Sequence, residues 1–507
     1  MAAKFVNIDR NTPMLLPPDL RDWVAENDLV HFVIEAVERL PLELFKVNHR
    51  GTGDAQFPPH MMLSLLIYCY ANGVFSSRKI ESATWRDVSV RYLTADHHPD
   101  HDTICTFRRR NFKAIAEAFV DVLELARQLQ LLKIGNIALD GTHIKANASI
   151  DQNITYKRAV EIREQLRLDI EELMQQAEKA DREDEELQKL PKEISRREKL
   201  AAKLDGAMEE LRERAARRDA DAKTQYEKKL EKRRRYQEET GKKPKGRTPK
   251  EPAYGPENSE EQCNLTDADA RIMRKNKRAG YTQSYNAQAA VDADGSQLIA
   301  GAHVSQSPSD SGELEPGINC IDARTGKPES VSTDAGYVNA DMIEKIETEH
   351  GIEVYCSVHR EDAHSERRYD YRPKKATGRA TKKIRDPRLI RMRDKLRSDE
   401  GKAIYSRRNH TVETAFGIIK EVMGFRGFLL RGHQKVTGEW NLVCLSYNLK
   451  RLHNLKRARE AKTAIVPRPP CIFSSPARLR ARRLLEHPRP SPWRCGLIFP
   501  APHVFAF

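Results

Sequence analysis

The spacing of apolar residues predicts helices over the first quarter of the chain. An apolar run from Met61 to Tyr70 follows Pro58-Pro59 and predicts a buried helix that ends near Ala71. This run is too short to span a bilayer, so no membrane association is expected. A second helix is expected from the Asn27-Asp28 pair to Leu40. We interpret residues 1–125 as a helical N-terminal domain.

A basic run closes one of these expected helices. Arg108, Arg109 and Arg110 follow Asp102 and Thr103, either of which would serve as the N-cap. Short helices with a capped, arginine-rich member are typical of helix-turn-helix DNA-binding units. We therefore predict that the three arginines contact DNA. The alternative is a plain helical bundle with a solvated basic face.

Residues 156–240 have a different pattern, in which isolated apolar residues recur at spacings of three, four and seven. Nearly every position between them is charged or Gln, and Pro191 interrupts the pattern. This predicts a coiled-coil hairpin that folds on itself, with dimerisation through the same seam as the alternative. Residues 241–261 lack a core pattern and are interpreted as a flexible basic linker. The apolar positions are Ile162, Leu166, Leu173, Ala177, Ala180, Ile194, Ala201, Leu204, Met208, Leu211 and Ala215.

Strand patterns occupy the rest of the chain, in residues 130–155 and 262–455. Asp294-Gly295 separates two apolar runs, which is a strong hairpin signal. Short apolar runs also end at Asp140 and Asp334, and helices are expected at 411–423 and 438–456. The pattern indicates a mixed α/β core. Residues 465–507 are rich in Pro and Arg and are predicted to be disordered.

Composition points to a polyanionic partner. The chain of 507 residues has a formal net charge of +14, which favours nucleic acid or an anionic surface. Its eight cysteines form no CxxC motif and read as reduced thiols. The N-terminus has no apolar signal-peptide region, so a cytoplasmic location is expected.

Three acidic residues stand out against this basic background. Asp140 and Asp334 end two expected strands, and Glu413 lies within an expected helix. Cleavage of a phosphodiester requires an activated nucleophile and a stabilised leaving oxygen, which two metal ions about 4 Å apart provide. Carboxylates are the hard oxygen ligands that Mg²⁺ prefers. We therefore expect these three side chains to converge into one metal-binding pocket.

Five stretches lie at residues 138–149, 264–273, 280–288, 333–337 and 405–432. Together, and in this order along the chain, they resemble the bacterial insertion-sequence transposases of the DDE class that carry a coiled-coil insert after the first Asp. The last stretch contains a Tyr–Arg–Glu–Lys signature, matched by type at Tyr405, Arg408, Glu413 and Lys420. Four residues separate Arg408 from Glu413, where the common pattern has three, which puts the equivalence of Arg408 in doubt. The resemblance covers residues 10–455.

The resemblance implies a fold, a reaction and partners. The fold is an RNase H-like mixed sheet flanked by helices, with an all-α N-terminal domain. Asp140, Asp334 and Glu413 would bind two Mg²⁺ ions, with Mn²⁺ as a possible substitute. The reaction would be DNA strand cleavage and strand transfer by direct in-line attack. Tyr405, Arg408 and Lys420 would contact DNA. A homodimer or higher multimer on double-stranded terminal repeats and target DNA, in the bacterial nucleoid, is implied as well.

Two other functions remain open at this point. The Leu139-Asp140-Gly141-Thr142 segment echoes the nucleophile loop of aspartyl-phosphate phosphatases, but no acid lies two residues from Asp140. A decayed, non-catalytic DNA-binding or coiled-coil scaffold protein is the second alternative.

Overall fold

The architecture is built around one mixed sheet. The computed structural model describes residues 19–41, 43–47, 56–182, 190–244, 246–274, 280–358 and 384–464. The strand order is β6-β5-β1-β7-β8. The short strand β4 pairs with the beginning of β5, and β6 pairs with the rest of it. β1, β7 and β8 are parallel, and β5 is antiparallel to β1 and β6. The strands are β1 (Asn136–Lys145), β4 (Arg271–Met273), β5 (Thr282–Asp292), β6 (Ile299–Ser305), β7 (Ser330–Thr333) and β8 (Glu353–Cys356).

Three antiparallel strands followed by two parallel strands are the RNase H-like order, so the predicted fold class is confirmed. The predicted β5–β6 hairpin is present at Asp294-Gly295, where Gly295 has a φ of 121°. This positive φ favours glycine because it has no Cβ.

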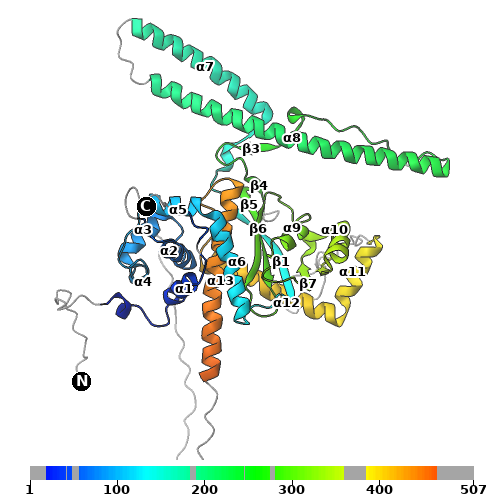
Figure 1. Cartoon of the computed structure of the whole chain (residues 1–507). Coiled ribbons are helices and arrows are strands. Elements are labelled where there is room, and N and C mark those ends of the chain that lie inside the picture. Colours follow the sequence, from blue (N-terminus) through cyan, green and yellow to red (C-terminus); the bar gives the residue numbers. More distant parts are fainter. Residues whose placement is uncertain are drawn as a thin grey trace, which may run out of the picture. The chain divides into compact units, whose positions relative to one another are not determined.

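Helices cover both faces of the sheet (Figure 1). Successive residues of β1 point to opposite faces, so Ala138 and Ile144 enter one hydrophobic core while Ile137 and Leu139 enter the other. The first core includes residues of the N-terminal helices, α12 (Asp399–Gly417) and α13 (His433–Ala464). The second includes residues of α9 (Leu314–Asn319), α10 (Ala340–Lys345) and α11 (Pro387–Arg397).

The N-terminal region is helical, as predicted, but one cap differs. The carboxylate of Asp100 accepts a hydrogen bond from the Thr103 amide at 2.6 Å, so Asp100 is the N-cap of α5, not Asp102 or Thr103. The elements are η1 (Leu20–Trp23), α1 (Leu29–Glu38), α2 (Pro59–Ala71), α3 (Ser77–Arg86), α4 (Val88–Leu93), α5 (His101–Arg110) and α6 (Phe112–Gln128).

A buried polar network joins the N-terminal helices to α13. Arg108 of α5 donates to the Tyr70 hydroxyl at 2.6 Å, and that hydroxyl donates to Glu439 of α13 at 3.3 Å. Glu439 is fully buried and also accepts the amide hydrogens of Leu429 and Leu430, each at 3.0 Å. The network therefore connects the helical domain, α13 and the loop before α13.

The insertion forms the predicted hairpin of two helices. α7 (Tyr156–Arg182) and α8 (Leu190–Thr240) pack through a seam that includes Leu166 and Leu204, so the seam is filled within one chain. The short strands β2 (Asn153–Thr155) and β3 (Gln262–Asn264) pair antiparallel at its base. Pro191 lies in the first turn of α8, where proline is tolerated, and the connection at 183–189 lies outside the described residues.

The segment after α8 is not a free linker, which corrects the prediction for residues 241–261. Arg233 of α8 donates to the carbonyl oxygens of Pro244 and Gly246 at 3.4 and 3.1 Å. Farther along, the Gly255 amide donates to Asp219 at 2.6 Å, and Arg218 donates to the Gly255 carbonyl at 3.0 Å. These backbone contacts hold the segment beside α8, a role that composition alone did not indicate.

The remaining short elements complete the chain. They are the 3₁₀ turns η2 (Ile150–Gln152), η3 (Pro256–Asn258) and η4 (Ala335–Tyr337), and the π-helical turns η5 (Ile346–His350) and η6 (Ile418–Val422). The predicted disordered tail at 465–507 lies outside the described residues. Over the described ranges, no helix combines the length and the apolar character needed to cross a membrane.

Candidate active site

Asp140 and Asp334 lie at equivalent positions on neighbouring parallel strands. Ala138 of β1 pairs with Ser332 of β7, and each aspartate follows its paired residue by two positions. The carboxylate of Asp334 also caps the η4 turn by accepting the Gly336 amide at 2.8 Å. The two carboxylates predicted to act together are thus brought to one place in the sheet, where β7 ends beside the middle of β1.

Asp140 is a mostly buried carboxylate with one cationic partner. Its Oδ2 lies 3.2 Å from Nη2 of the buried Arg408, its Oδ1 accepts the Gly141 amide at 2.8 Å, and its side chain is 18% exposed. Burial raises the pKa of Asp140 to about 7, Arg408 opposes this shift, and the negative charges of Asp334 and Asp310 add to it. The site is therefore short of positive charge despite Arg408.

This pKa has a measurable consequence for the metal-free protein. A carboxyl whose pKa is higher in the folded state than the ordinary value of about 3.9 keeps its proton longer when folded. We expect the free energy of unfolding to fall as pH rises from about 4 to about 7, by up to about 1.4 kcal/mol per pH unit from this group. Urea denaturation in EDTA at pH 5, 6 and 7 measures the effect. The Asp140→Asn variant should show a shallower pH dependence, and parallel curves for the two proteins would contradict the assignment.

A third aspartate, Asp310, lies beside the first two. Its Oδ1 accepts hydrogen bonds from the side-chain amides of Asn286 and Gln288 at 2.8 and 2.7 Å. A Cβ on Gly141 would approach Asp310 Oδ1 to 2.6 Å, and a Cβ on Gly336 would lie 3.5 Å from Asp310 Oδ2. Asp140 and Asp334 are thus each followed closely by a glycine that leaves space for Asp310.

The Asp310 network extends to the turn that follows Asp334. Tyr337 is fully buried and its hydroxyl donates to Oε1 of Gln288, whose amide nitrogen binds Asp310. Burial raises the pKa of Tyr337, and the charges of Asp310, Asp140 and Asp334 add to this shift. The hydroxyl therefore stays protonated and serves as a fixed donor.

Helix α12 and its π-helical continuation η6 place the predicted signature residues in different environments. Lys420 Nζ donates to the Thr142 hydroxyl and lies 3.5 Å from the His143 carbonyl, so it contacts β1 just after Asp140. Tyr405 is half-buried; burial raises its pKa, while Arg408 and a hydrogen bond to Ser357 lower it. Glu413 is exposed on α12, one residue after the buried Val412.

The expected three-carboxylate pocket is not closed in this arrangement. Over the described ranges, no three His, Cys, Asp or Glu side chains are gathered closely enough to hold a metal ion. The contacts supply the reason: Arg408 binds Asp140, two amides bind Asp310, and the Glu413 side chain is exposed. The structure places Asp140 and Asp334 near Asp310, and the place of Glu413 in the ligand set stays a prediction.

Comparisons with protein families give two matches. The description "Transposase DDE domain" matches residues 247–449, and the description "Transposase domain (DUF772)" matches residues 18–110. The chain belongs to the insertion-sequence transposases of the DDE class. Searches of curated proteins and of solved structures give no significant match.

The DDE-domain match covers only part of the candidate active site. Asp334 and Glu413 lie within the DDE-domain match, whereas Asp140 and both helices of the α7–α8 hairpin precede it. Asp140 is joined to the matched region by the ladder between β1 and β5 and by the Arg408 ion pair.

The arginine run of this transposase is not a uniform DNA-binding surface. Arg108 is 4% exposed and donates to Tyr70 and to the Phe75 carbonyl, so the prediction that it contacts DNA is corrected. It faces inward because its hydrogen-bond acceptors, the Tyr70 hydroxyl and the Phe75 carbonyl, lie in the protein interior. Arg109 and Arg110 are exposed, and their contact with DNA stays a prediction.

The donor set of the transposase fits a hard divalent cation in part. Asp140, Asp334 and Asp310 offer carboxylate oxygens, the ligand type that Mg²⁺ prefers. The raised pKa of Asp140 reflects burial first and then the two neighbouring negative charges, which a bound cation would relieve. The sequence around Asp310, Ser307-Pro308-Ser309-Asp310, is typical of a turn and does not by itself indicate a site residue.

Proposed function

We propose that this transposase cleaves DNA strands at the ends of an insertion sequence and joins the freed 3′ ends to target DNA. The observation that carries the proposal is the register of β1 and β7, which gives Asp140 and Asp334 equivalent positions on neighbouring parallel strands. The family supports the reaction class, and the carboxylates support its dependence on metal.

Asp140 and Asp334 are proposed to hold two Mg²⁺ ions, with Glu413 completing the ligand set when α12 is engaged by DNA. When bound, the ions activate the attacking oxygen and neutralise charge on the phosphodiester. Mn²⁺, which also accepts carboxylate oxygens, is expected to substitute.

The other residues of the chain position these groups. Arg408 offsets the charge of Asp140 and fixes the orientation of its carboxylate. Lys420 is proposed to hold a DNA phosphate near β1, since its ammonium already lies beside Thr142. Tyr405 is proposed to contact DNA near the end of β8. Arg408 is proposed to affect DNA binding only indirectly, by holding the Asp140 carboxylate in place.

A cleavage and joining assay tests the proposed function. A supercoiled plasmid that carries the element's own ends is incubated with the purified full chain and Mg²⁺, Mn²⁺ or EDTA, and a plasmid with scrambled ends is the control. We expect new 3′-hydroxyl ends and joined products only with a metal and intact ends. Equal products in EDTA would contradict the metal mechanism. DNA binding without any product in Mg²⁺ would favour the scaffold alternative.

Asp310 is expected to support the two aspartates. Asp310→Asn keeps the shape but removes one negative charge and weakens the acceptor for Asn286 and Gln288. Because outer groups that orient metal ligands typically contribute about 10–100-fold, we expect a rate loss on this scale, recovered in part at higher Mg²⁺. Initial cleavage rates over a Mg²⁺ titration measure it, and an unchanged rate at every concentration would exclude the role.

The partners follow from the reaction. The substrate is double-stranded DNA at terminal repeats and target sites, and nucleoid DNA in a bacterial cytoplasm is the proposed setting. Two element ends must be joined to one target, so a homodimer or higher multimer on DNA is proposed. Neither family match supports the phosphatase alternative.

A further inference from the structure

The charges of the α7–α8 insertion are distributed very unevenly. Helix α7 carries six Lys and Arg against seven Asp and Glu, and residues 190–227 of α8 carry ten against nine. Residues 228–250 carry eleven Lys and Arg against only three Asp and Glu. We call residues 228–250 the basic arm: the last three turns of α8 and the segment that follows it.

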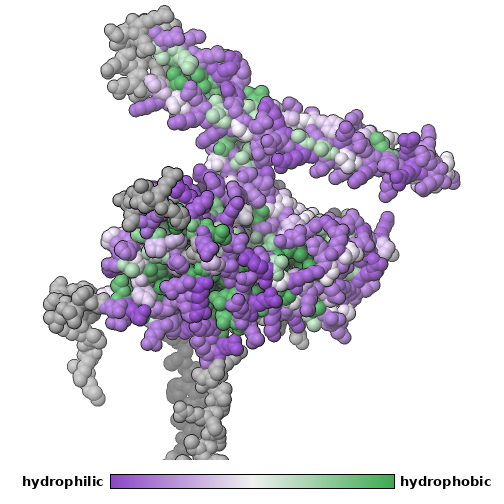
Figure 2. All heavy atoms as spheres, in the orientation of Figure 1, coloured by the Kyte–Doolittle hydropathy of each residue, from purple (hydrophilic) through white to green (hydrophobic). Residues whose placement is uncertain are grey.

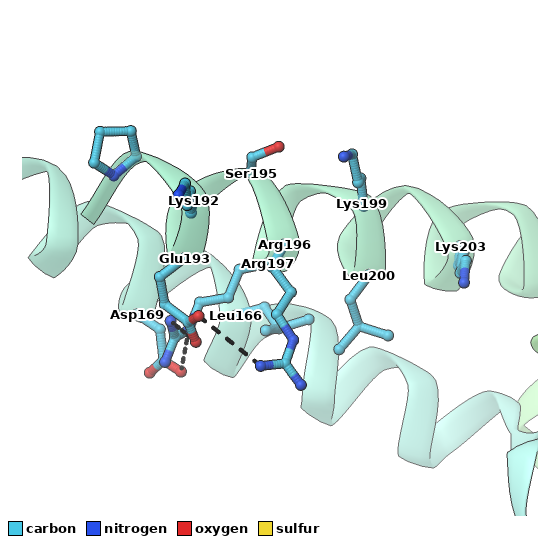
Figure 3. A pocket seen from close by; sticks show the side chains of 11 residues that line it. Leu166, Asp169, Lys192, Glu193, Ser195, Arg196, Arg197, Lys199, Leu200 and Lys203 are labelled. Atoms are coloured by element: carbon cyan, nitrogen blue, oxygen red, sulfur yellow. Dashed lines mark hydrogen bonds and ion pairs between the residues drawn. The ribbon is translucent and has the colours of Figure 1, made fainter. Parts of the chain in front are cut away.

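In the balanced half of the insertion, several arginines are paired with acidic side chains. Arg163 lies 2.8 Å from Asp205 across the two helices, and Arg197 lies 2.9 Å from Glu193 and 3.7 Å from Asp169. Figure 3 shows this stretch, where Leu166 and Leu200 also project between the helices. Because basic and acidic side chains nearly balance in number, this half of the insertion carries little net charge.

The basic arm differs in this respect. Arg234 and Arg235 pair with Glu238 and Glu231, but no ion pair is found for Lys228, Lys229 or Lys232 among the described residues. These three lysines are exposed, and α8 is strongly hydrophilic along this part in Figure 2. The arm therefore presents unneutralised positive charge to solvent.

The fold adds a second row of basic residues to this surface. Arg233 donates to the carbonyls of Pro244, Gly246 and Arg247, so it holds the returning segment beside α8. Lys242, Lys243 and Arg247, all exposed, belong to that segment. A groove of about 550 Å³ lies between α8 and this segment, lined by Lys229, Lys232, Arg233, Tyr236, Pro244 and Pro249.

We propose that the basic arm binds the phosphate backbone of duplex DNA without reading its sequence, outside the DNA segment held at the candidate active site. The 13 helical residues from Lys228 to Thr240 are about 20 Å long, close to the rise of six base pairs. A polyanion of regular charge spacing suits a linear row of lysines that have no acidic partners. This proposal rests on the proposed function, since it gives the transposase an additional contact to its DNA substrate.

The test compares two triple variants of the full chain. In the first, Lys228, Lys229 and Lys232 are replaced by Gln; in the matched control, Lys192, Lys199 and Lys203 of the same helix, also exposed, are replaced by Gln. Gln and Lys have similar helix propensities, so α8 should stay folded, which far-ultraviolet circular dichroism checks. Binding of a 30-base-pair duplex of random sequence is measured by fluorescence anisotropy in EDTA at several salt concentrations.

We expect the arm variant to bind at least about tenfold more weakly at low salt, with the slope of log affinity against log salt reduced by two to three, since each phosphate contact contributes about 0.9. The control should change the slope by less than about one. Equal slopes for the arm variant and wild type would overturn the proposal. Because binding is measured without metal, a transposase that binds through the arm but never cleaves would contradict only the proposed function.

Discussion

Substitution of Asp140 or Asp334 with Asn is expected to reduce strand cleavage about a thousandfold or more. Each change keeps the shape of the side chain but removes its negative charge and one of two equivalent oxygen donors. Loss of a group that acts directly at the reacting centre commonly costs 10² to 10⁴ in rate. Because the two aspartates have equivalent positions in the β1–β7 register, we expect similar losses from either one and little further loss from both.

The control for this experiment is Asp399→Asn, which changes a fully exposed aspartate in the first turn of α12. It should cleave at a rate close to that of wild type. All variants should bind end-bearing duplex in EDTA as wild type does, which separates chemistry from binding. Cleavage by the Asp140 or Asp334 variant within tenfold of wild type would remove that residue from the active site.

Glu439→Ala is expected to lower the free energy of unfolding by about 3–5 kcal/mol. The substitution removes the buried negative charge that is linked to Arg108 through the Tyr70 hydroxyl, and it leaves two backbone amides, those of Leu429 and Leu430, without an acceptor. Breaking one side of a buried charge pair has a cost on this scale because the remaining charge stays out of water. Urea denaturation followed by circular dichroism measures the change.

The matched control is Glu35→Ala, which removes a half-exposed carboxylate paired with Arg39 and, at 4.0 Å, with Lys456 of α13. Such surface pairs contribute at most about 1 kcal/mol. A second variant, Glu439→Gln, keeps an oxygen acceptor for the amides and should lose less than Glu439→Ala. If Glu439→Ala and Glu35→Ala destabilised the protein equally, the network would not hold the N-terminal helices against α13.

The local sequence pattern was sufficient to predict strands at Asp140 and before Asp334. Ile137-Ala138-Leu139-Asp140 and Val331-Ser332-Thr333-Asp334 read as buried strands that end in an acid, and the structure has β1 and β7 there. Only β7 ends as predicted, directly before Asp334, because β1 continues past Asp140 to Lys145. The Asp294-Gly295 turn and the self-packed hairpin were equally accessible, because turn chemistry and heptad spacing are local properties.

Residues whose roles depend on distant partners could not be read in this way. Arg108 belongs to an exposed-looking basic run, yet Tyr70 and Glu439 draw it inward from 38 and more than 300 residues away. Asp310 looks like a loop residue until the β1–β5 ladder places Gly141 opposite Gln288. Composition also failed for residues 241–261, because backbone carbonyls, which have no sequence signature, accept the hydrogen bonds of Arg233.

The pairing of β2 with β3 has a consequence for the order of folding. Lys145 and Ser284, which are paired at the end of the β1–β5 ladder, are 139 positions apart, and closing so long a loop early is entropically unfavourable. If the insertion folds first, with β2 paired to β3, only two short connections separate Lys145 and Ser284 from the folded insertion. The entropic free-energy cost of bringing these two residues together is then lower by about 1–1.5 kcal/mol. Early folding of the insertion would therefore bring β1 and β5, which lie before and after it in the chain, close enough to pair.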